Sequence, residues 1–586
     1  MEVYFSEENV IKLLCKYRAN AANKRHESHM MRNISLHPST NRINITDKLT
    51  SFKFLQSIFP TRRNWPKLKQ SERKICRDAI STNKRRLYKS YELTKLNIGT
   101  GKTEAPTWYN NLISFVNKLR KDVLSGDLNS IEIGVPNIKG LKKEEKNNKI
   151  IYRPIALYDF SSKIICSITA RYLTHYFDSI FHGCSYAFRG KNSLNQIPNH
   201  HDCIDAIAKY RNQNKNLWVA ECDIQKFFDT VQHDHLLDIF KKLIQEIQDK
   251  TLKAIDPRAI VVFEKFLGSF CFQENVIPLN HNDKYFTTNN LPKGEFGWVE
   301  EELNTKFGTD YCKKFRIGVP QGNAISCFVS NLILHEVDKA VLEVTPVPFY
   351  IRYCDDMILM HENQEACSMA LGVYMDEIKK RFLLFHDPLD VTNYREKENG
   401  KAFWKVKSKR PFFWGDKHVD ERNVPWVSFV GYQMNFHGNL RVRKSTIKKE
   451  VKKQISETEK VLKALGKFNR RLTIKNENAR LPSKHISFRL LQKLISMSVG
   501  RVKIHTHKNP SQQGLCWTNG FKMLDHNRIT SQQLRYLDKR RRMQLYRVNT
   551  EIKKITKQSN VSLYPEHLKS IFFGSAFAYY NFLKHK

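Results

Sequence analysis

Apolar runs interrupted by polar turns predict strands in the middle of the chain. The stretch "FYIRYCDDMILM" (349–360) is largely apolar on both sides of two adjacent carboxylates, Asp355 and Asp356. This pattern predicts a strand, a tight turn and a second strand. A shorter apolar run, "LWVAECD", predicts a strand that ends at Asp223. We therefore expect carboxylates at the ends of two neighbouring strands.

Three other segments have helical periodicity. The segment that begins "YRPIALYDF" has the apolar period of a buried helix in its second half. The turn "PQG" (320–322) precedes a helix whose expected inward residues are Ile325, Phe328, Val329, Leu332 and Ile333. A helix capped by Ser445 has an apolar face formed by Ile447, Val451, Ile455, Val461, Leu462 and Leu465. Its lysines project elsewhere, so we expect one face to pack and the other to be basic.

Changes in composition divide the chain into four expected parts. Residues 1–110 form a basic N-terminal extension with helical pieces and no chemical motif. The strand patterns fall in 111–215 and 216–435, and the second of these has an insertion at about 241–315 that is rich in Asn and Gly. Residues 436–586 are helical and basic.

The charge of the chain points to a polyanionic partner. The 586 residues include 99 Lys and Arg against 58 Asp and Glu, a net charge of +41, which is more than solubility requires. From Arg441 to Lys586 we count 34 basic and 8 acidic residues. Nucleic acid is therefore the expected partner, with solvated helix faces as the alternative for the C-terminal excess.

Cysteine usage and hydropathy predict a cytoplasmic protein with no membrane contact. The 12 cysteines are scattered singly, without zinc spacing or a disulfide framework. The N-terminal stretch "MEVYFSEENV" has no basic-then-apolar signal, and the sequence contains no run of about 18 apolar residues.

The strand-end carboxylates are candidates for a metal site. Adjacent like charges such as Asp355 and Asp356 repel, and a divalent cation relieves that repulsion. With Asp223 on a neighbouring strand, the three could bind two ions about 3.5–4 Å apart, as phosphoryl transfer requires. For the stretch 349–360 alone, an ordinary acidic hairpin turn is the alternative.

The order of the motifs carries more information than any one of them. The sequence contains D-x4-F-D from Asp223, then PQG, then YxDD, then "FVGY" at 429–432. Over roughly residues 130–470 this order resembles bacterial reverse transcriptases, the group that includes retron, group II intron and abortive-infection enzymes. The resemblance implies an α+β right-hand polymerase, with fingers (111–215), an RRM-like palm with an antiparallel sheet (216–435) and a helical thumb with the C-terminal region (436–586).

The resemblance also implies roles for individual residues. The implied catalytic metal ligands for two Mg²⁺ ions, with Mn²⁺ as the alternative, are Asp223, Asp355 and Asp356. The implied nucleotide-binding residues are Arg153, with Lys146 or Lys149 as its companion, Phe228, Gln321 and Gly322. Those near the primer are Tyr353, Cys354 and the primer grip of Phe429, Val430, Gly431 and Tyr432. Nucleic-acid contacts are expected from Lys448, Lys449, Lys452 and Lys453.

Phe228 favours deoxynucleotides. An aromatic ring five residues after Asp223 would occupy the space of a ribose 2′-hydroxyl, whereas related RNA polymerases resemble D-x4-D there. A buried core Phe is the alternative, but Phe227 can fill that role if the two side chains point to opposite faces.

Several departures define the subgroup. The gap from Asp223 to Pro320 is long, the general-acid lysine has only Lys397 and Lys401 as candidates, and the sequence shows no zinc endonuclease pattern. The long insertion, the N-terminal extension and the basic helical C-terminus resemble the defence-associated reverse transcriptases most. The expected partners are an RNA template or noncoding RNA, dNTPs and a DNA product, and a protein partner or oligomer is left open. Template-independent or protein-primed DNA synthesis, and a non-catalytic RNA-binding or splicing protein, are the alternative functions.

Overall fold

The chain divides into two compact units in the computed structural model. The structure describes residues 1–34, 48–76, 79–191, 196–390, 396–475 and 527–559, with single positions at 490, 494, 521, 523 and 524. The first unit contains Met1–Val10 and Ser114–Val430, and the second contains Ile11–Ile113 and Gly431–Lys586.

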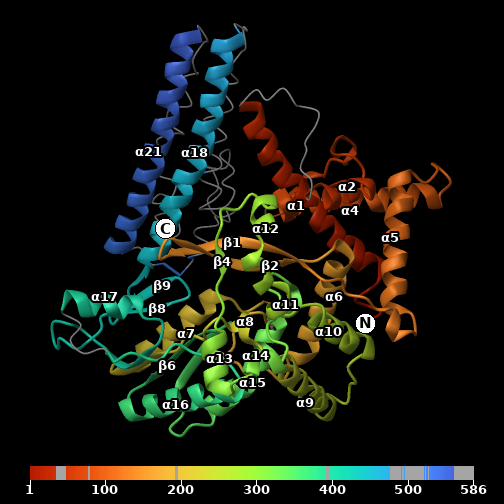
Figure 1. The fold of residues 1–586 in the computed structure, drawn as a ribbon. Coiled ribbons are helices and arrows are strands. Elements are labelled where there is room, and N and C mark those ends of the chain that lie inside the picture. Colours follow the sequence, from red (N-terminus) through yellow and green to blue (C-terminus); the bar gives the residue numbers. More distant parts are fainter. Residues whose placement is uncertain are drawn as a thin grey trace. The chain divides into compact units, whose positions relative to one another are not determined.

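A four-stranded sheet forms the centre of the first unit (Figure 1). Its order is β5-β6-β3-β7, with bounds β3 (Leu217–Glu221), β5 (Phe349–Tyr353), β6 (Asp356–His361) and β7 (Lys409–Trp414). All three strand pairs are antiparallel. Helix α16 (Gln364–Lys380) packs on β3, β6 and β7, and α15 (Ala324–Leu342) packs on α16. This strand order and the packing of α16, which follows β6, confirm the predicted RRM-like palm in an α+β fold.

A smaller, three-stranded sheet precedes the palm in sequence. Strand β2 (Lys149–Leu157) lies between β1 (Asn137–Lys146), which is antiparallel to it, and β4 (Glu295–Phe296), which is parallel to it. We call this the fingers sheet. The predicted buried helix follows as α6 (Phe160–Phe177), where the Asp159 side chain caps the N-terminus by accepting from Ser162 N–H.

Short helices make up most of the region between β3 and α15. They are α8 (Phe227–Thr230), α9 (His233–Thr251), α10 (Pro257–Gly268), α11 (Phe272–Asn275), η3 (Ile277–His281), α12 (Asp283–Thr288), α13 (Glu300–Phe307) and α14 (Tyr311–Lys314). The Asn- and Gly-rich insertion contributes to two apolar cores, one around Phe286 and Phe296 that includes Tyr152 of β2, and one around Leu303 and Tyr311 that includes Leu384. The remaining elements of the first unit are η2 (Leu128–Ser130), α7 (His200–Gln213), α17 (Lys397–Lys405) and β8 (Trp426–Phe429).

The second unit is mainly helical. Its N-terminal elements are most of α1 (Glu7–Ile34), then α2 (Lys48–Ser57), η1 (Arg62–Asn64), α3 (Gln70–Ile75), α4 (Ala79–Gly99) and the first turns of α5 (Thr107–Leu124). Its C-terminal elements are β9 (Tyr432–Asn435), β10 (Leu440–Val442), α18 (Lys444–Lys475) and α21 (Arg528–Ser559). Strands β9 and β10 pair in antiparallel register.

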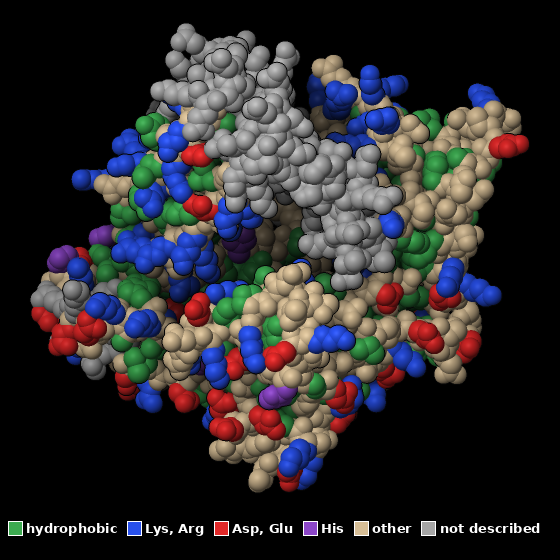
Figure 2. Space-filling model, turned by 45° about the horizontal axis from the view of Figure 1, so that its top comes forward, with side chains coloured by type: hydrophobic (Ala, Val, Ile, Leu, Met, Phe, Trp, Pro, Cys, Tyr) green, Lys and Arg blue, Asp and Glu red, His purple; other side chains and the backbone are tan. Residues whose placement is uncertain are grey.

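Helices α18 and α21 pack side by side (Figure 1). The predicted apolar face of α18 is buried at Ile447, Val451, Val461 and Leu465, and α21 buries Leu537, Val548 and Ile552. Helix α18 begins at Lys444, one residue before the predicted cap at Ser445. Lys and Arg side chains gather on the side of the view in Figure 2 where this helix pair lies. Among the described residues, no helix combines the length and apolarity that a bilayer crossing requires.

Candidate active site

The turn between β5 and β6 presents the two adjacent carboxylates. Tyr353 pairs with Asp356 at the end of the hairpin, and Cys354 and Asp355 form the connection. Cys354 takes a left-handed conformation with φ of +63°, which turns the chain within two residues. Asp355 is half-buried and Asp356 is exposed. The predicted strand, turn and strand are therefore confirmed.

A buried arginine supports this turn from below. The Arg352 side chain is 1% exposed, and its Nε and Nη2 donate to the two carboxylate oxygens of Asp338 on α15 at 2.9 and 2.6 Å. Its Nη1 donates to the Cys354 carbonyl at 2.8 Å. A bidentate, buried pair of this kind has a fixed geometry. Arg352 therefore ties the carboxylate turn to the helix behind the sheet.

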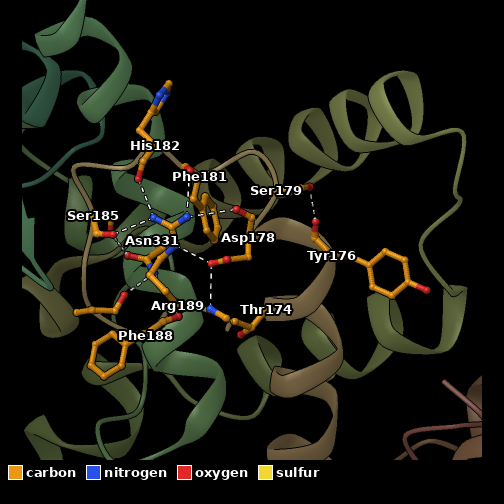
Figure 3. Close-up of polar contacts among 12 residues, drawn as sticks. Thr174, Tyr176, Asp178, Ser179, Phe181, His182, Ser185, Phe188, Arg189 and Asn331 are labelled. Atoms are coloured by element: carbon orange, nitrogen blue, oxygen red, sulfur yellow. Dashed lines mark hydrogen bonds and ion pairs between the residues drawn. The ribbon is translucent and has the colours of Figure 1, made fainter. Parts of the chain in front are cut away.

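A second polar network holds the segment 184–189 against the free side of β5 (Figure 3). Asn331 accepts from Ser185 Oγ at 2.9 Å and donates to the Ala187 carbonyl at 2.8 Å. Arg189 donates to the Asp178 carboxylate and to the carbonyls of His182 and Ser185. The sequence did not point to Asn331, because its partners Ser185 and Ala187 are distant in the chain.

Asp223 follows β3 at the same end of the sheet. The β3–β6 register pairs Ala220 with Leu359, and its extension by three residues brings Asp223 level with Asp356. The Asp223 amide donates to Ser408 Oγ at 2.9 Å, and its carbonyl accepts from His386 N–H at 3.0 Å. Both backbone groups are thus fixed, and the carboxylate remains for other partners.

The electrostatics of Asp355 show that the carboxylates are close neighbours. Burial raises the pKa of the Asp355 carboxyl, and the charge of Asp223 raises it further. Hydrogen bonds from its own backbone and from Cys354, and the charge of Arg153, act in the opposite direction. Burial and the neighbouring charge of Asp223 therefore disfavour the ionised form of Asp355.

One protein cation already lies at this position. Lys407 Nζ donates to Asp223 Oδ2 at 2.9 Å and lies 3.1 Å from His386 Nε2. The two lysines suggested by the sequence are elsewhere: Lys401 pairs with Glu398 on α17, and the side chain of Lys397 lies outside the described residues. Lys407 was missed because it is 184 residues from Asp223 along the chain.

The residues present fit a divalent ion, although the described part of the chain contains no ready-made cluster of three or more His, Cys, Asp or Glu ligands. The carboxylates of Asp223 and Asp355 are hard oxygen ligands of the type that Mg²⁺ prefers. The ammonium of Lys407 already satisfies Asp223 with positive charge. Asp223 and Asp355 would hold the ion, with Asp356 beside them, once Lys407 moves away.

The turn after Asp223 separates its two phenylalanines. Lys226 adopts φ of +48°, and the single turn α8 follows. Phe227 is 2% exposed, whereas Phe228 is half-buried. Phe227 thus fills the core position, as expected, and the Phe228 ring is left accessible to a ligand. Its role as the sugar gate stays a prediction.

The PQG turn joins this loop to the fingers sheet. Gln321 Nε2 donates to the buried Asp229 carboxylate at 2.7 Å, and the Gln321 carbonyl accepts from Ala156 N–H on β2 at 2.9 Å. Gly322 has φ of +100°, and a Cβ there would lie 3.3 Å from Ile155. Burial raises the pKa of Asp229, and the positive charge of Lys226 partly offsets this shift by lowering it.

Arg153 lies on β2, exposed at the surface. Its positive charge lowers the pKa of both Asp355 and Asp229. Lys143, the extra residue at the β1 bulge, also acts on Asp229. The predicted companions are further along the hairpin: Lys149 pairs with Glu295 at 3.5 Å, and Lys146 is opposite Lys149 at the tip. Lys143 is therefore an additional candidate for the companion of Arg153. The bulge that positions it is visible only in the structure.

The remaining predicted residues are placed as follows. Tyr353 and Cys354 lie at the carboxylate turn. In the predicted primer grip, Val430 and Gly431 have φ of +40° and +90°, as in a two-residue hairpin turn. This turn spans the boundary between the two units. On α18, in the second unit, the predicted nucleic-acid-binding residues Lys448, Lys449, Lys452 and Lys453 are exposed.

The chain is similar to known proteins over part of its length. Residues 141–279 match the family model "Reverse transcriptase (RNA-dependent DNA polymerase)". The group II intron-encoded protein LtrA of Lactococcus lactis subsp. cremoris is 24% identical over 200 residues, which are 34% of this chain and 24% of LtrA. The same protein of strain MG1363 matches to the same extent. The chain thus spans about a quarter of the length of the curated relatives it matches.

Solved structures of telomerases superpose loosely. Apo telomerase of Candida tropicalis, truncated from its C-terminal domain, gives a TM-score of 0.32 at 13% identity, covering 56% of this chain and 60% of that chain. The C. tropicalis telomerase in complex with a fragment of telomeric RNA gives 0.33 at 11% identity, covering 85% and 76%. Such superpositions carry no argument about function. Residues 141–279 of this chain are therefore similar to a reverse transcriptase domain.

Proposed function

We propose that this protein is an RNA-directed DNA polymerase that joins deoxynucleotides by phosphoryl transfer. The observation that carries the proposal is the pair Asp223 and Asp355, which lie at one end of the palm sheet with coupled charges. A non-catalytic RNA-binding protein would gain nothing from carboxylates that repel phosphate. Phe228, five residues after Asp223, is half-buried, and the charge of Arg153 lowers the pKa of Asp355.

The chain's own residues take the following parts in this reaction. Arg153 and Lys143 bind the triphosphate, and Phe228 packs against C2′ of the incoming sugar. Gln321 and Gly322 support the nucleotide from the PQG turn, and Lys146 and Lys149 stay proposed companions of Arg153. Lys407, released from Asp223, donates a proton to the leaving pyrophosphate.

Asp223 and Asp355, with Asp356 beside them, hold two Mg²⁺ ions or, as the alternative, Mn²⁺. When bound, the ions lower the pKa of the primer 3′-hydroxyl and stabilise the charge that develops on the leaving group. On this proposal Tyr353 and Cys354 lie under the primer terminus. Phe429, Val430, Gly431 and Tyr432 form the primer grip.

We further propose that the enzyme acts in bacterial antiphage defence, in the cytoplasm, and copies a noncoding RNA. The support is the resemblance of its motifs and its long insertion to defence-associated enzymes. The basic C-terminal region, with exposed lysines on α18, is the proposed RNA contact. Sequencing the nucleic acid that copurifies with the protein, before and after RNase and DNase, tests this part.

The experiment for the polymerase activity is primer extension by the full chain. We expect dNTP incorporation on an RNA template with Mg²⁺ or Mn²⁺, and none with EDTA. Equal incorporation without any template would favour template-independent synthesis. Tight RNA binding with no incorporation under any metal would favour the non-catalytic alternative and contradict the proposal.

A further inference from the structure

Both edges of the fingers sheet are closed by side chains of the insertion. On β1, the Tyr285 hydroxyl accepts from Gly140 N–H at 2.9 Å and donates to the Ile138 carbonyl at 3.1 Å. On β4, Asn280 donates to the Phe296 carbonyl at 3.1 Å and accepts from Phe296 N–H at 2.7 Å. Each side chain supplies a donor and an acceptor, as a neighbouring strand would. We call Tyr285 and Asn280 the frame residues.

The insertion also packs an aromatic layer behind Arg153. Tyr152, its neighbour on the opposite face of β2, lies 5.9 and 6.0 Å, between ring centroids, from Phe286 and Phe296. The Tyr152 hydroxyl donates to the Pro292 carbonyl at 2.8 Å. A Cβ at Gly294 would collide with the carbonyl of Ile150, so β4 approaches β2 as closely as the backbone allows.

The same insertion contacts the palm loop that carries Phe228. Lys226 Nζ donates to the Gly297 carbonyl, one residue after β4. Where the insertion ends, Val319 N–H donates to the Phe228 carbonyl and Gly318 N–H to the Val231 carbonyl, both at 2.7 Å. The insertion thus joins the strand that carries Arg153 to the turn that carries Phe228.

We propose that the frame residues Tyr285 and Asn280 are positioning residues that fix Arg153 for the triphosphate before the nucleotide binds. This inference rests on the proposed polymerase function. An isolated two-stranded hairpin is marginally stable, and ordering it on binding would weaken affinity. Because the frame residues order the β1–β2 hairpin in advance, nucleotide binding does not bear the free-energy cost of ordering it. The frame residues therefore act on nucleotide binding and not on the chemical step.

The test is a double-mutant cycle between Tyr285→Phe and Arg153→Ala, measured as steady-state dNTP incorporation by the full chain. Tyr285→Phe keeps the ring and removes only the hydroxyl. We expect it to raise KM for the dNTP roughly three- to tenfold, a net effect at the low end for the two hydrogen bonds that the hydroxyl makes, with kcat little changed. In the Arg153→Ala background the same substitution should raise KM by less than about twofold.

Tyr172→Phe is the matched control, because the Tyr172 hydroxyl accepts from Asp256 N–H at 2.8 Å next to α10, away from the fingers sheet. It should lower the melting temperature to a similar extent and leave KM unchanged. If Tyr285→Phe does not fold, Asn280→Ala tests the other edge by the same criteria.

A frame variant that behaves like Tyr172→Phe, or that raises KM equally in both backgrounds, overturns the inference while the polymerase proposal stands. A wild-type protein that incorporates no dNTP overturns the polymerase proposal itself. The two failures are therefore distinguishable.

Discussion

Phe228 is the residue on which the proposed choice of sugar depends. Its ring is half-buried next to Phe227, which fills the core. Phe228→Ala opens the space of a 2′-hydroxyl, so we expect kcat/KM for GTP to rise relative to dGTP on one defined template and primer. Truncation of a buried Phe costs up to about 3–5 kcal/mol, so the melting temperature is measured in parallel. A folded variant that keeps full discrimination would remove the physical basis of the assignment.

Lys407 is the proposed general acid because its ammonium lies 2.9 Å from Asp223. Lys407→Gln keeps a polar side chain, shorter by one atom, and loses the transferable proton. General acid catalysis contributes about 10²–10⁴-fold, so kcat should fall by at least about a hundredfold while KM for the dNTP stays near the wild-type value. Lys405→Gln, at the exposed end of α17, is the control and should leave kcat unchanged. Equal rates for Lys407→Gln and the control would contradict the role.

At the residue scale, the sequence predicted those site residues that belong to a local pattern of apolar and polar positions. Asp223 and Asp355 end strands whose apolar runs are visible in the chain, and the structure places them together. Lys407 and Lys143 have no such pattern, since one depends on contact with a residue far along the chain and the other on a bulge. Their proximity to the carboxylates is decided by tertiary structure.

Among the elements, α15 combines an apolar core with a buried polar face. His335 is 3% exposed, and its ring stacks on His182 at 4.8 Å between centroids. Burial, and then the neighbouring His182, lower the pKa of His335 to about 4. Asp338, Glu246 and Glu336 oppose this shift. The folded protein therefore keeps His335 neutral at a pH where the unfolded chain takes up a proton.

This titration predicts a pH dependence of stability. As the pH falls through about 6.5 the unfolded state gains a proton that the folded state does not, so the free energy of unfolding decreases until the pH reaches about 4. The loss is at most about 3 kcal/mol. We expect His335→Gln to flatten the fall of the melting temperature between these pH values. Parallel curves for the two proteins would show that His335 is not the group responsible.

Helix α18 has the two faces that its sequence predicts. Val451 and Leu465 are buried, and the four lysines at 448, 449, 452 and 453 are exposed. If these lysines bind phosphate, their replacement by Gln should reduce the slope of log K against log salt by about 0.7–0.9 for each phosphate that is no longer neutralised. The measurement is RNA binding at several salt concentrations. An unchanged slope would assign these lysines to a solvated face.

The insertion was the element least accessible from sequence. Its Asn and Gly residues indicated turns, but several are structural: Asn282 caps α12 by accepting from Tyr285 N–H, and Gly294 allows β4 to approach β2. The capping pattern could have suggested short helices. The parallel pairing of a two-residue strand could not have been predicted, because it depends on the position of β2.

At the scale of the molecule, the first unit brings the chemistry together. It contains the palm, the fingers sheet and every predicted residue that would touch the nucleotide. The second unit contributes the basic helix pair. The net charge of +41 supports nucleic-acid binding by the whole chain. The predicted boundaries of fingers, palm and thumb stay predictions.

The most direct test of the proposed polymerase site is single-nucleotide dNTP incorporation on an RNA template by Asp223→Asn and Asp355→Asn. Both variants should be slower by at least about a hundredfold, because a metal ligand is removed while the shape is kept. Burial disfavours the ionised Asp355, so without metal Asp355→Asn should melt no lower than wild type at neutral pH.

Asp376→Asn, on the exposed face of α16 beside Lys379, is the matched control and should polymerise at the wild-type rate. We predict that both site variants fail to incorporate dNTPs while they keep their fold and their affinity for RNA. Wild-type rates in either Asp223→Asn or Asp355→Asn would contradict the two-carboxylate site.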